Sequence, residues 1–494
     1  MADEKKVSDE ELDEFKNEEN PEHKPLNIQD SLSIKNPWSV IDNKTNKKID
    51  NSSSSELKSD LIEKDINNPK SPQKSILLSH NEKSPTSNHQ KTHQEPNKLD
   101  EENKTNQNVS IDLPPKQVTL QDICKKYQNE DLFKDIYPIL LKLWNEPGRD
   151  RALGCIAGAF IGDSIGSYLE FNNQPKKEVV NAAMFMPGGG TFNLVPGQVT
   201  DDSEIALCLA NGLILGEGTL NLDHIAAQYR DWMQSFPFDI GSTIGSAFFP
   251  LYEVKKQVGE FPFSKAITKS AFKNNQLSES NGCLMRITPL AIWCRNLSEK
   301  DIKKAVKAEI RHTHPSKIVL KACFYWVLAI VKLMNLVDKP DKTEEENIKL
   351  RMETVYEEIK SKIQFEKEMD DWWKLVEENK YISANDRMGW MKIAWTYGFI
   401  FLKQRQIDYY EIIKDVISRG GDTDTNACIV GGMIGSAIGF KRIPLQYLEK
   451  MILCNSTIGC KPRKPFFNPR NGLILGDEIY EMAPKNLLIK SEDL

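Results

Sequence analysis

The residues best suited to chemistry form two acidic clusters that lie far apart in the chain. Asp422 and Asp424 follow a pair of glycines in the stretch GGDTDT, where they alternate with threonine hydroxyls. Asp201 and Asp202 follow Thr200 at the start of an apolar run. Carboxylate and hydroxyl oxygens are the ligands that a hard divalent cation such as Mg²⁺ or Ca²⁺ selects. Together, the clusters predict a site in which oxygen atoms alone hold one or two metal ions.

Each acidic cluster also has a simpler interpretation, because carboxylates are favoured in the first turn of any helix. Either cluster alone could be a solvated turn with a helix cap. An EF-hand is excluded at the second cluster, since Ala427 stands where that loop needs glycine and Met433 where it needs a bidentate glutamate. Two clusters that both lead into apolar helical runs favour a shared metal site.

Glycines at every fourth position predict two helices whose backbones pack closely together. The two sets are Gly154, Gly158, Gly162 and Gly166, and Gly431, Gly435 and Gly439. Glycines at this spacing share one face of a helix, where the missing side chains let another helix approach. A membrane-spanning pair is disfavoured because Asp163 interrupts the first set. Asp163 and Glu170 are expected at or just beyond the end of the first helix. A buried carboxylate there is expected to have a hydrogen-bonding or ionic partner, or a functional role.

The composition divides the chain into a polar tail and a helical domain. Residues 1–117 are rich in Asn, Ser, Lys, Asp, Glu and Pro and contain only two aromatic residues, Phe15 and Trp38. Such a segment buries too little apolar surface to offset the entropy lost on ordering, so we predict that it is disordered. Residues 118–494 contain few alternating β-branched runs and are predicted to form one all-α domain.

One highly charged stretch, residues 338–380, is predicted to be a surface insertion in this domain. Its helical part is expected to be amphipathic, with Trp372 and Trp373 pinning it to the body of the domain. A partner contact through the two tryptophans is the alternative. Phe324 to Val337 is the most apolar stretch, but Lys332 and its short length predict a core helix rather than a membrane span.

Charge and cysteine usage exclude several classes of protein. A net charge of −6 and an isoelectric point near 5.8 argue against a general nucleic-acid binder. Nine cysteines are scattered without a CxxC pair, which disfavours a disulfide framework or a zinc site. No apolar signal segment is visible at the N-terminus. We therefore expect an intracellular protein, in the cytoplasm in the first place, with the nucleus as the alternative, and no membrane partner.

Six stretches of the chain carry a resemblance to a known family. In order they are GCIAGAFIGDSIGSYLEF, PGQVTDDSEIALCLANGL, NGCLMRITPLAIW, THPSK, MGWMKIAW and RGGDTDTNACIVGGMIGSAIG. The sequence resembles the ADP-ribosylglycohydrolase family, which includes hydrolases of ADP-ribosylarginine, ADP-ribosylserine and poly-ADP-ribose, and the dinitrogenase reductase-activating glycohydrolases. The resemblance covers about residues 150–480. It implies a compact orthogonal bundle of helices with two Mg²⁺ ions at the base of an ADP-ribose cleft.

The resemblance also implies roles for particular residues. The metal ligands of the family fall on Thr200, Asp201, Asp202, Asp422, Asp424 and Thr425. A loop that contacts the distal ribose and the phosphates falls on Asn281, Gly282, Cys283 and Met285, and a nearby histidine falls on His314. Glu170 matches a flexible glutamate beside the metals and is the first candidate for general acid and base, with Asp201 or Asp202 as the alternative. A solvated surface glutamate remains the other interpretation of Glu170.

The expected reaction is hydrolysis of the glycosidic bond between ADP-ribose and a protein side chain or a second ADP-ribose. Its transition state resembles an oxocarbenium ion and requires proton transfer. An inactive ADP-ribose-binding or structural member of the family is the alternative, and a metal-dependent phosphohydrolase is a third. The expected partners are an ADP-ribosylated protein or a small molecule that contains ADP-ribose, and the chain is expected to be a monomer. The sequence leaves open which linkage is cleaved.

Overall fold

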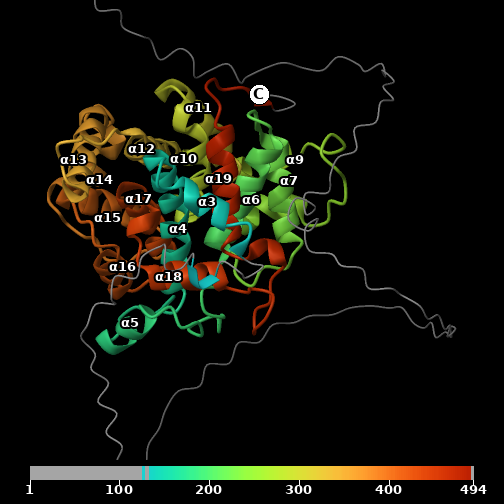
Figure 1. Ribbon diagram of the computed structural model, residues 1–494. Helices are drawn as coiled ribbons and strands as arrows, with labels where there is room; N and C mark the ends of the chain where they lie inside the picture. The colour runs from blue at the N-terminus through green and yellow to red at the C-terminus, as the bar shows by residue number, and fades with distance from the viewer. Residues whose placement is uncertain (1–124, 128–132, 491–494) are drawn as a thin grey trace, which may run out of the picture. The chain divides into compact units, whose positions relative to one another are not determined.

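The structure is a computed structural model that describes residues 125–127 and 133–490, and helices dominate this part of the chain (Figure 1). The predicted tail, residues 1–117, and the predicted domain boundary lie outside the described residues. The first helices are α3 (Tyr137–Lys142), α4 (Pro147–Gly166), α5 (Lys177–Ala183), α6 (Asp201–Leu215), α7 (Leu222–Met233), α8 (Ser242–Phe248), α9 (Phe263–Asn274) and α10 (Thr288–Trp293).

The remaining helices run to the C-terminal end of the described chain. They are α11 (Glu299–Ile310), α12 (Lys317–Asn335), α13 (Glu344–Ile363), α14 (Asp370–Glu377), α15 (Met391–Gln404), α16 (Tyr409–Ser418), α17 (Thr423–Ile438), α18 (Leu445–Leu453) and α19 (Asn471–Met482). Two-residue strands, β1 (Leu220–Asn221) and β2 (Ile489–Lys490), pair in parallel. The predicted all-α fold class is confirmed.

Helices α4 and α17 pack backbone to backbone and run antiparallel. A Cβ added to Gly158 would overlap with the carbonyl oxygen of Gly431, and a Cβ added to Gly162 would overlap with that of Ala427. At the end of α4, Gly166 lies against the first residue of α17, and the Thr423 hydroxyl donates a 2.7 Å hydrogen bond to the Gly166 carbonyl. The predicted contact between glycine-lined helices is therefore confirmed. It brings the end of α4 to the start of α17.

The start of α6 is held against α4 by a side chain from outside the helix. Thr200, the residue before α6, makes no capping hydrogen bond of its own to this helix. Asp163 of α4 instead accepts hydrogen bonds from the backbone N–H groups of Thr200, at 3.1 Å, and Ser203, at 3.2 Å. A carboxylate at this position satisfies backbone donors that the first turn leaves unpaired. Three helix ends, those of α4, α6 and α17, thus meet at one point.

Residues 338–380, the stretch predicted to be an insertion, form helices that aromatic side chains fasten to the domain, as expected for Trp372 and Trp373. Trp372 and Trp373 of α14 are buried, and the Trp373 ring stacks on Tyr356 of α13 with 5.4 Å between ring centroids. Both tryptophans also contact Trp395 of α15. By length and composition, helix α12 could cross a membrane. However, 72% of its apolar stretch is buried inside the structure. That burial agrees with the predicted core helix.

Candidate functional site

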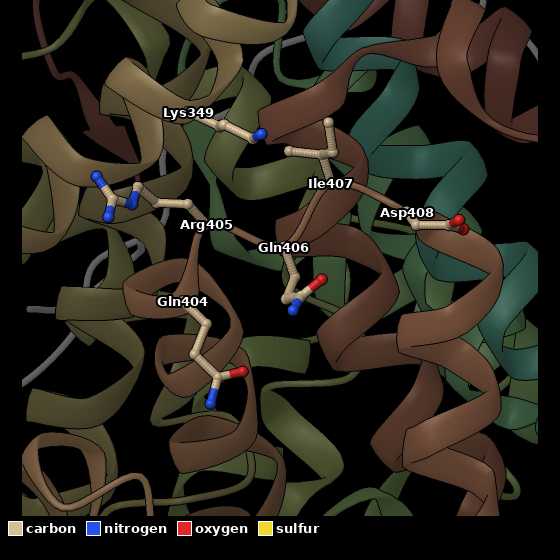
Figure 2. Close-up of a pocket in the computed structure, with 6 residues that line it drawn as sticks. All are labelled: Lys349, Gln404, Arg405, Gln406, Ile407 and Asp408. Atoms are coloured by element: carbon tan, nitrogen blue, oxygen red, sulfur yellow. The ribbon is translucent and has the colours of Figure 1, made fainter.

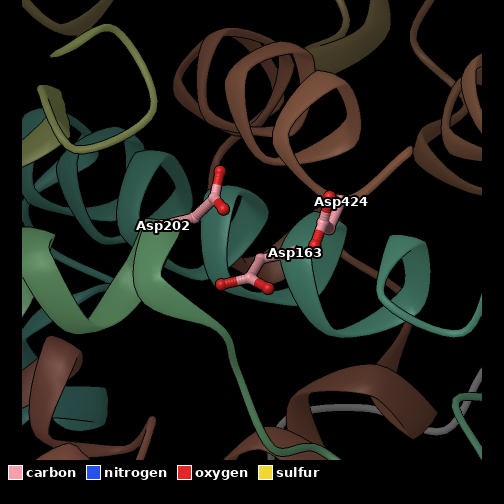
Figure 3. Close-up of side chains that lie close together, drawn as sticks. All are labelled: Asp163, Asp202 and Asp424. Atoms are coloured by element: carbon pink, nitrogen blue, oxygen red, sulfur yellow. The ribbon is translucent and has the colours of Figure 1, made fainter. Parts of the chain in front are cut away.

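Three buried aspartates meet where the three helix ends come together. Asp163 comes from α4, Asp202 from α6 and Asp424 from α17, and each offers a carboxylate oxygen within 4.8 Å of the other two (Figure 3). The two acidic clusters of the sequence are therefore neighbours in space. Two contacts explain how this happens. The antiparallel packing of α4 and α17 places the end of α4 beside the start of α17, and Asp163 of α4 holds the start of α6 at the same place.

A second group of carboxylates shares Asp424 with the first. Glu170, Asp239 and Asp424 also place carboxylate oxygens within 4.8 Å of one another. Glu170 lies in the turn that follows α4, and only 7% of its surface is exposed. The interpretation of Glu170 as a solvated surface residue is therefore wrong. Asp239 is half-buried and lies in the loop between α7 and α8.

The other predicted ligands surround these two groups. The Thr200 and Thr425 hydroxyls donate to one oxygen of Asp202, at 3.1 and 3.4 Å, while its Oδ1 is buried without a hydrogen-bond partner in the described chain. Asp422 accepts a 2.7 Å hydrogen bond from the side-chain amide of Asn281. The carboxyl groups of Asp201 and Asp239 also lie beside each other. All six predicted metal ligands thus lie at one place.

The carboxylates of this cluster lie close together, and no positively charged side chain in the described chain balances their negative charge. Burial raises the pKa of Asp163 to about 7, and burial together with the charge of Asp239 raises the pKa of Glu170 to about 8. Burial, followed by repulsion from neighbouring carboxylates, also holds three further pKa values well above the usual aspartate range, those of Asp201, Asp202 and Asp424. Within the described residues, no lysine or arginine forms an ion pair with any of these groups.

A bound cation fits this arrangement. Buried carboxylates without counter-charges are costly, and a divalent ion supplies the missing positive charge. Asp202 Oδ1 and Glu170 Oε2 are buried oxygens that no described donor reaches, so both remain available to a cation or to water. Asp163 differs from the rest, because both of its oxygens accept hydrogen bonds from Thr200 and Ser203. It supports the ligand-bearing end of α6 rather than offering free oxygens.

Comparison with known proteins identifies the family of this chain. A sequence profile described as ADP-ribosylglycohydrolase matches residues 145–460, which is more than half of the chain. The chain belongs to the ADP-ribosylglycohydrolase family. The matched range includes both acidic clusters, Glu170 and Asp239.

Relatives of this chain are found in a virus and in bacteria. The chain is 31% identical to a putative ADP-ribosyl glycohydrolase of Acanthamoeba polyphaga mimivirus, over 62% of this chain and 92% of the relative. It is 24% identical to the ADP-ribosyl-[dinitrogen reductase] glycohydrolase of Rhodospirillum rubrum, over 61% of this chain and 90% of the relative. It is 25% identical to the ADP-ribosylarginine hydrolase Tri1 of Serratia proteamaculans, over 61% of this chain and 75% of the relative.

The predicted substrate loop lies directly beside the acidic cluster. Asn281 begins a short 3₁₀ turn, Asn281–Cys283, and reaches the cluster through Asp422. The side chains of Cys283 and Met285 are buried, and Cys283 Sγ lies 3.7 Å from Cys323 Sγ. These two side chains face the protein interior, so any substrate contact at their positions would come from the backbone. Their predicted binding role stays a prediction.

His314 lies under the same loop and is fully buried. Its Nε2 is 2.7 Å from the Ser280 hydroxyl and its Nδ1 is 2.8 Å from the Thr313 hydroxyl. Arg286 fastens the loop from inside, because it donates to the Gly282 carbonyl at 2.8 Å and to the Thr313 hydroxyl at 2.9 Å. The structure therefore connects His314 and the loop through hydroxyl groups, but it places the His314 ring beneath the loop and not at the surface.

Asp239 is the acidic residue that sequence reasoning missed. It is the only carboxylate in the stretch FPFDIGST, so no spacing distinguishes it from a solvated loop residue. A separate surface cavity of about 390 Å³ is lined by Lys349 and by residues 404–408 (Figure 2). Its two basic side chains already pair with Glu345, at 2.6 Å, and Glu353, at 3.4 Å. The acidic cluster, not this cavity, is the candidate active site.

Proposed function

We propose that this ADP-ribosylglycohydrolase cleaves the glycosidic bond that joins ADP-ribose to a protein side chain, and that it requires two Mg²⁺ ions. The observation that carries the proposal is the pair of carboxylate groups that share Asp424, in a chain that belongs to the ADP-ribosylglycohydrolase family. The residues that would hold the ions are Thr200, Asp201, Asp202, Asp422, Asp424 and Thr425. Mg²⁺ suits ligands that are few, small and supplemented by water. Bound Mg²⁺ supplies positive charge for polarising a water molecule and for orienting sugar hydroxyls.

Glu170 is proposed to move the proton in this reaction. Hydrolysis breaks the bond from the anomeric carbon to the side-chain nitrogen or oxygen, and it forms a bond from that carbon to a water oxygen. One water proton must leave as the leaving group gains one. Glu170 is buried beside the other carboxylates, and its Oε2 has no described partner that would occupy it. Asp239, within 4.8 Å of it, is available to assist.

Arginine-linked ADP-ribose is the first linkage to test. The Serratia relative is named an ADP-ribosylarginine hydrolase, and serine-linked and poly-ADP-ribose substrates are the alternatives. In the experiment, the purified chain is incubated with each substrate, with Mg²⁺ or with EDTA, and free ADP-ribose is measured. Mg²⁺-dependent release of ADP-ribose is expected. Phosphate release would support the phosphohydrolase instead, and tight ADP-ribose binding without turnover on any substrate would support a binding protein.

A further inference from the structure

The loop between α5 and α6, residues 184–200, contains three consecutive glycines, Gly188 to Gly190. It packs directly on the segment that carries Glu170. The Thr191 hydroxyl donates a 2.8 Å hydrogen bond to the backbone carbonyl of Glu170. The preceding residue, Gly190, packs against the backbone of Tyr168, and no side chain would fit between them. A Cβ added to Gly190 would lie only 2.7 Å from the carbonyl oxygen of Tyr168. Gly190 also has a φ of 64°, a conformation that glycine adopts without strain. The loop thus contacts the backbone on the N-terminal side of Glu170 and at Glu170 itself.

Hydrogen bonds within this loop and to the C-terminal part of the chain hold it in place. Gly189 and Leu194 exchange backbone hydrogen bonds of 2.7 and 3.0 Å, which close the loop on itself. The Gln198 side chain accepts from the Val195 backbone at 3.1 Å and donates to the Lys461 carbonyl at 2.7 Å, which fixes the loop to the C-terminal part of the chain. The loop then continues into the first acidic cluster. A contact from it therefore ties Glu170 to the same framework that holds the predicted metal ligands.

A chain of aromatic rings adds a second contact between the same segments. The Phe192 ring lies 6.4 Å from that of Phe171 and 5.4 Å from that of Phe238, measured between centroids. Phe171 follows Glu170 in the chain, and Phe238 precedes Asp239. Ring pairs at these distances are mutually attractive. Phe192 thus joins the segment that carries Glu170 to the loop that carries Asp239.

The Glu170 segment needs such support. Glu170 lies beyond the last residue of α4, so helical hydrogen bonds no longer hold its backbone. Its side chain points into a group of like charges, and nearby carboxylates repel it once it is ionised. We propose that Thr191 is a positioning residue for Glu170, with Phe192 as the second support, so that the loop holds the Glu170 carboxylate at the reacting bond. This inference rests on the proposed function.

The first test removes the hydroxyl and keeps the shape. Thr191→Val should lower kcat about 10- to 100-fold with KM within about twofold, because a small displacement of a reacting group has effects of this size. Thr191→Ser should restore most of the loss. Thr354→Val is the matched control. The Thr354 hydroxyl also donates a 2.8 Å hydrogen bond to a backbone carbonyl, but it lies on the exposed face of α13, away from the acidic cluster. A Thr191→Val enzyme within twofold of the wild type, or a serine variant as slow as the valine one, would overturn the inference.

A double-mutant cycle separates positioning from general damage. If Thr191 acts through Glu170, Thr191→Val should slow the Glu170→Ala enzyme by less than about twofold. An equal loss in both backgrounds would show that Thr191 supports something other than Glu170. If Glu170→Ala itself retains full activity, the proposed function of Glu170 has failed, and that result is distinct from a failure at Thr191.

Amide hydrogen exchange provides a readout that does not depend on activity. The Phe171 N–H donates a 3.1 Å hydrogen bond to the Gly421 carbonyl, and the Asn172 N–H donates 2.9 Å to the Leu169 carbonyl. Thr191→Val should speed exchange at both amides at least tenfold, while Thr354→Val leaves it unchanged. Unchanged protection in Thr191→Val would contradict the positioning role, whichever substrate the enzyme uses.

Discussion

Gly158 and Gly431 touch backbone to backbone, so that a Cβ placed on either residue would overlap with the carbonyl oxygen of the other. The contact lies near the middle of the α4–α17 pair, and the Gly158 carbonyl also accepts a 2.5 Å hydrogen bond from the Tyr409 hydroxyl. No side-chain movement can relieve a clash between two backbones. The separation of α4 from α17, and with it the geometry of the acidic cluster, therefore depends on these two residues having no side chain.

The first prediction concerns this contact. Gly158→Ala should lower the free energy of unfolding by about 2–4 kcal/mol, because the added methyl group forces the two helices apart. Mg²⁺ affinity should fall as well, since α17 carries some of the predicted ligands and Asp163 of α4 holds the start of α6, which carries the others. Gly241→Ala is the control, because nothing lies within 4 Å of a Cβ there. Urea denaturation and calorimetric Mg²⁺ titration provide the measurements, and equal stability of the two variants would refute the prediction.

The second prediction concerns the metal ions. Asp422→Asn preserves size and an oxygen that can accept the hydrogen bond from Asn281, but it removes one negative charge. Mg²⁺ affinity should fall by about tenfold or more and activity should fall with it, while the helical fold is retained. Asp415→Asn removes a charge from a surface pair with Arg419 and should leave both unchanged. Full activity of the wild type in EDTA would exclude metal dependence.

The third prediction concerns Glu170. Glu170→Gln keeps size and hydrogen-bonding capacity but cannot transfer a proton. Turnover should fall by ~10²–10⁴, with ADP-ribose affinity and Mg²⁺ binding little changed. Glu178→Gln, on the exposed side of α5, provides a control for a change of charge nearby in the sequence. If turnover of Glu170→Gln stays within twofold of the wild type, Glu170 does not transfer the proton, and one of the aspartates becomes the candidate.

The fourth prediction is a pH effect far from the site. Burial raises the pKa of Asp150 to about 6, despite Lys441, whose charge lowers it. The folded chain therefore holds this proton more tightly than the unfolded chain, so stability is lost as pH rises from about 4 to about 6. Asp150→Asn removes this loss, on the order of 2 kcal/mol across that interval. The free energies of unfolding of the Asp150→Asn variant and the wild type should diverge as pH rises from about 4 to about 6, and curves that stay parallel would refute the prediction.

The fifth prediction concerns residues 1–117. Their composition cannot support a packed core, so a chain that begins at residue 118 should fold and hydrolyse substrate at the wild-type rate. Circular dichroism and the ADP-ribose release assay measure the two properties. Loss of either in the shortened protein would show that the tail contributes to the domain.

The fold and most of the candidate site were predictable because their signals are local. Glycines at every fourth position define a helix face wherever the partner lies, and Thr200 with two aspartates marks a helix start with spare oxygens. Asp239 carries no such signal, since only the packing of its loop brings it to Glu170. The contact from Thr191 was equally hidden, because its acceptor is a backbone carbonyl 21 residues earlier in the chain. Interactions made between loops, and directed to backbone atoms, leave no periodicity in a sequence.

The pairing of α4 with α17 has a consequence for how the protein is made. Thr423 and Gly166, which hydrogen-bond at the acidic cluster, are separated by 257 residues. At a synthesis rate of about 5–20 residues per second, α4 leaves the ribosome on the order of ten seconds or more before its partner exists. During that interval its glycine face has nothing to pack on, and contacts of such long range close slowly. The growing chain therefore lacks three of the six predicted metal ligands, Asp422, Asp424 and Thr425, throughout this interval, and the proposed metal site is completed only in a late step.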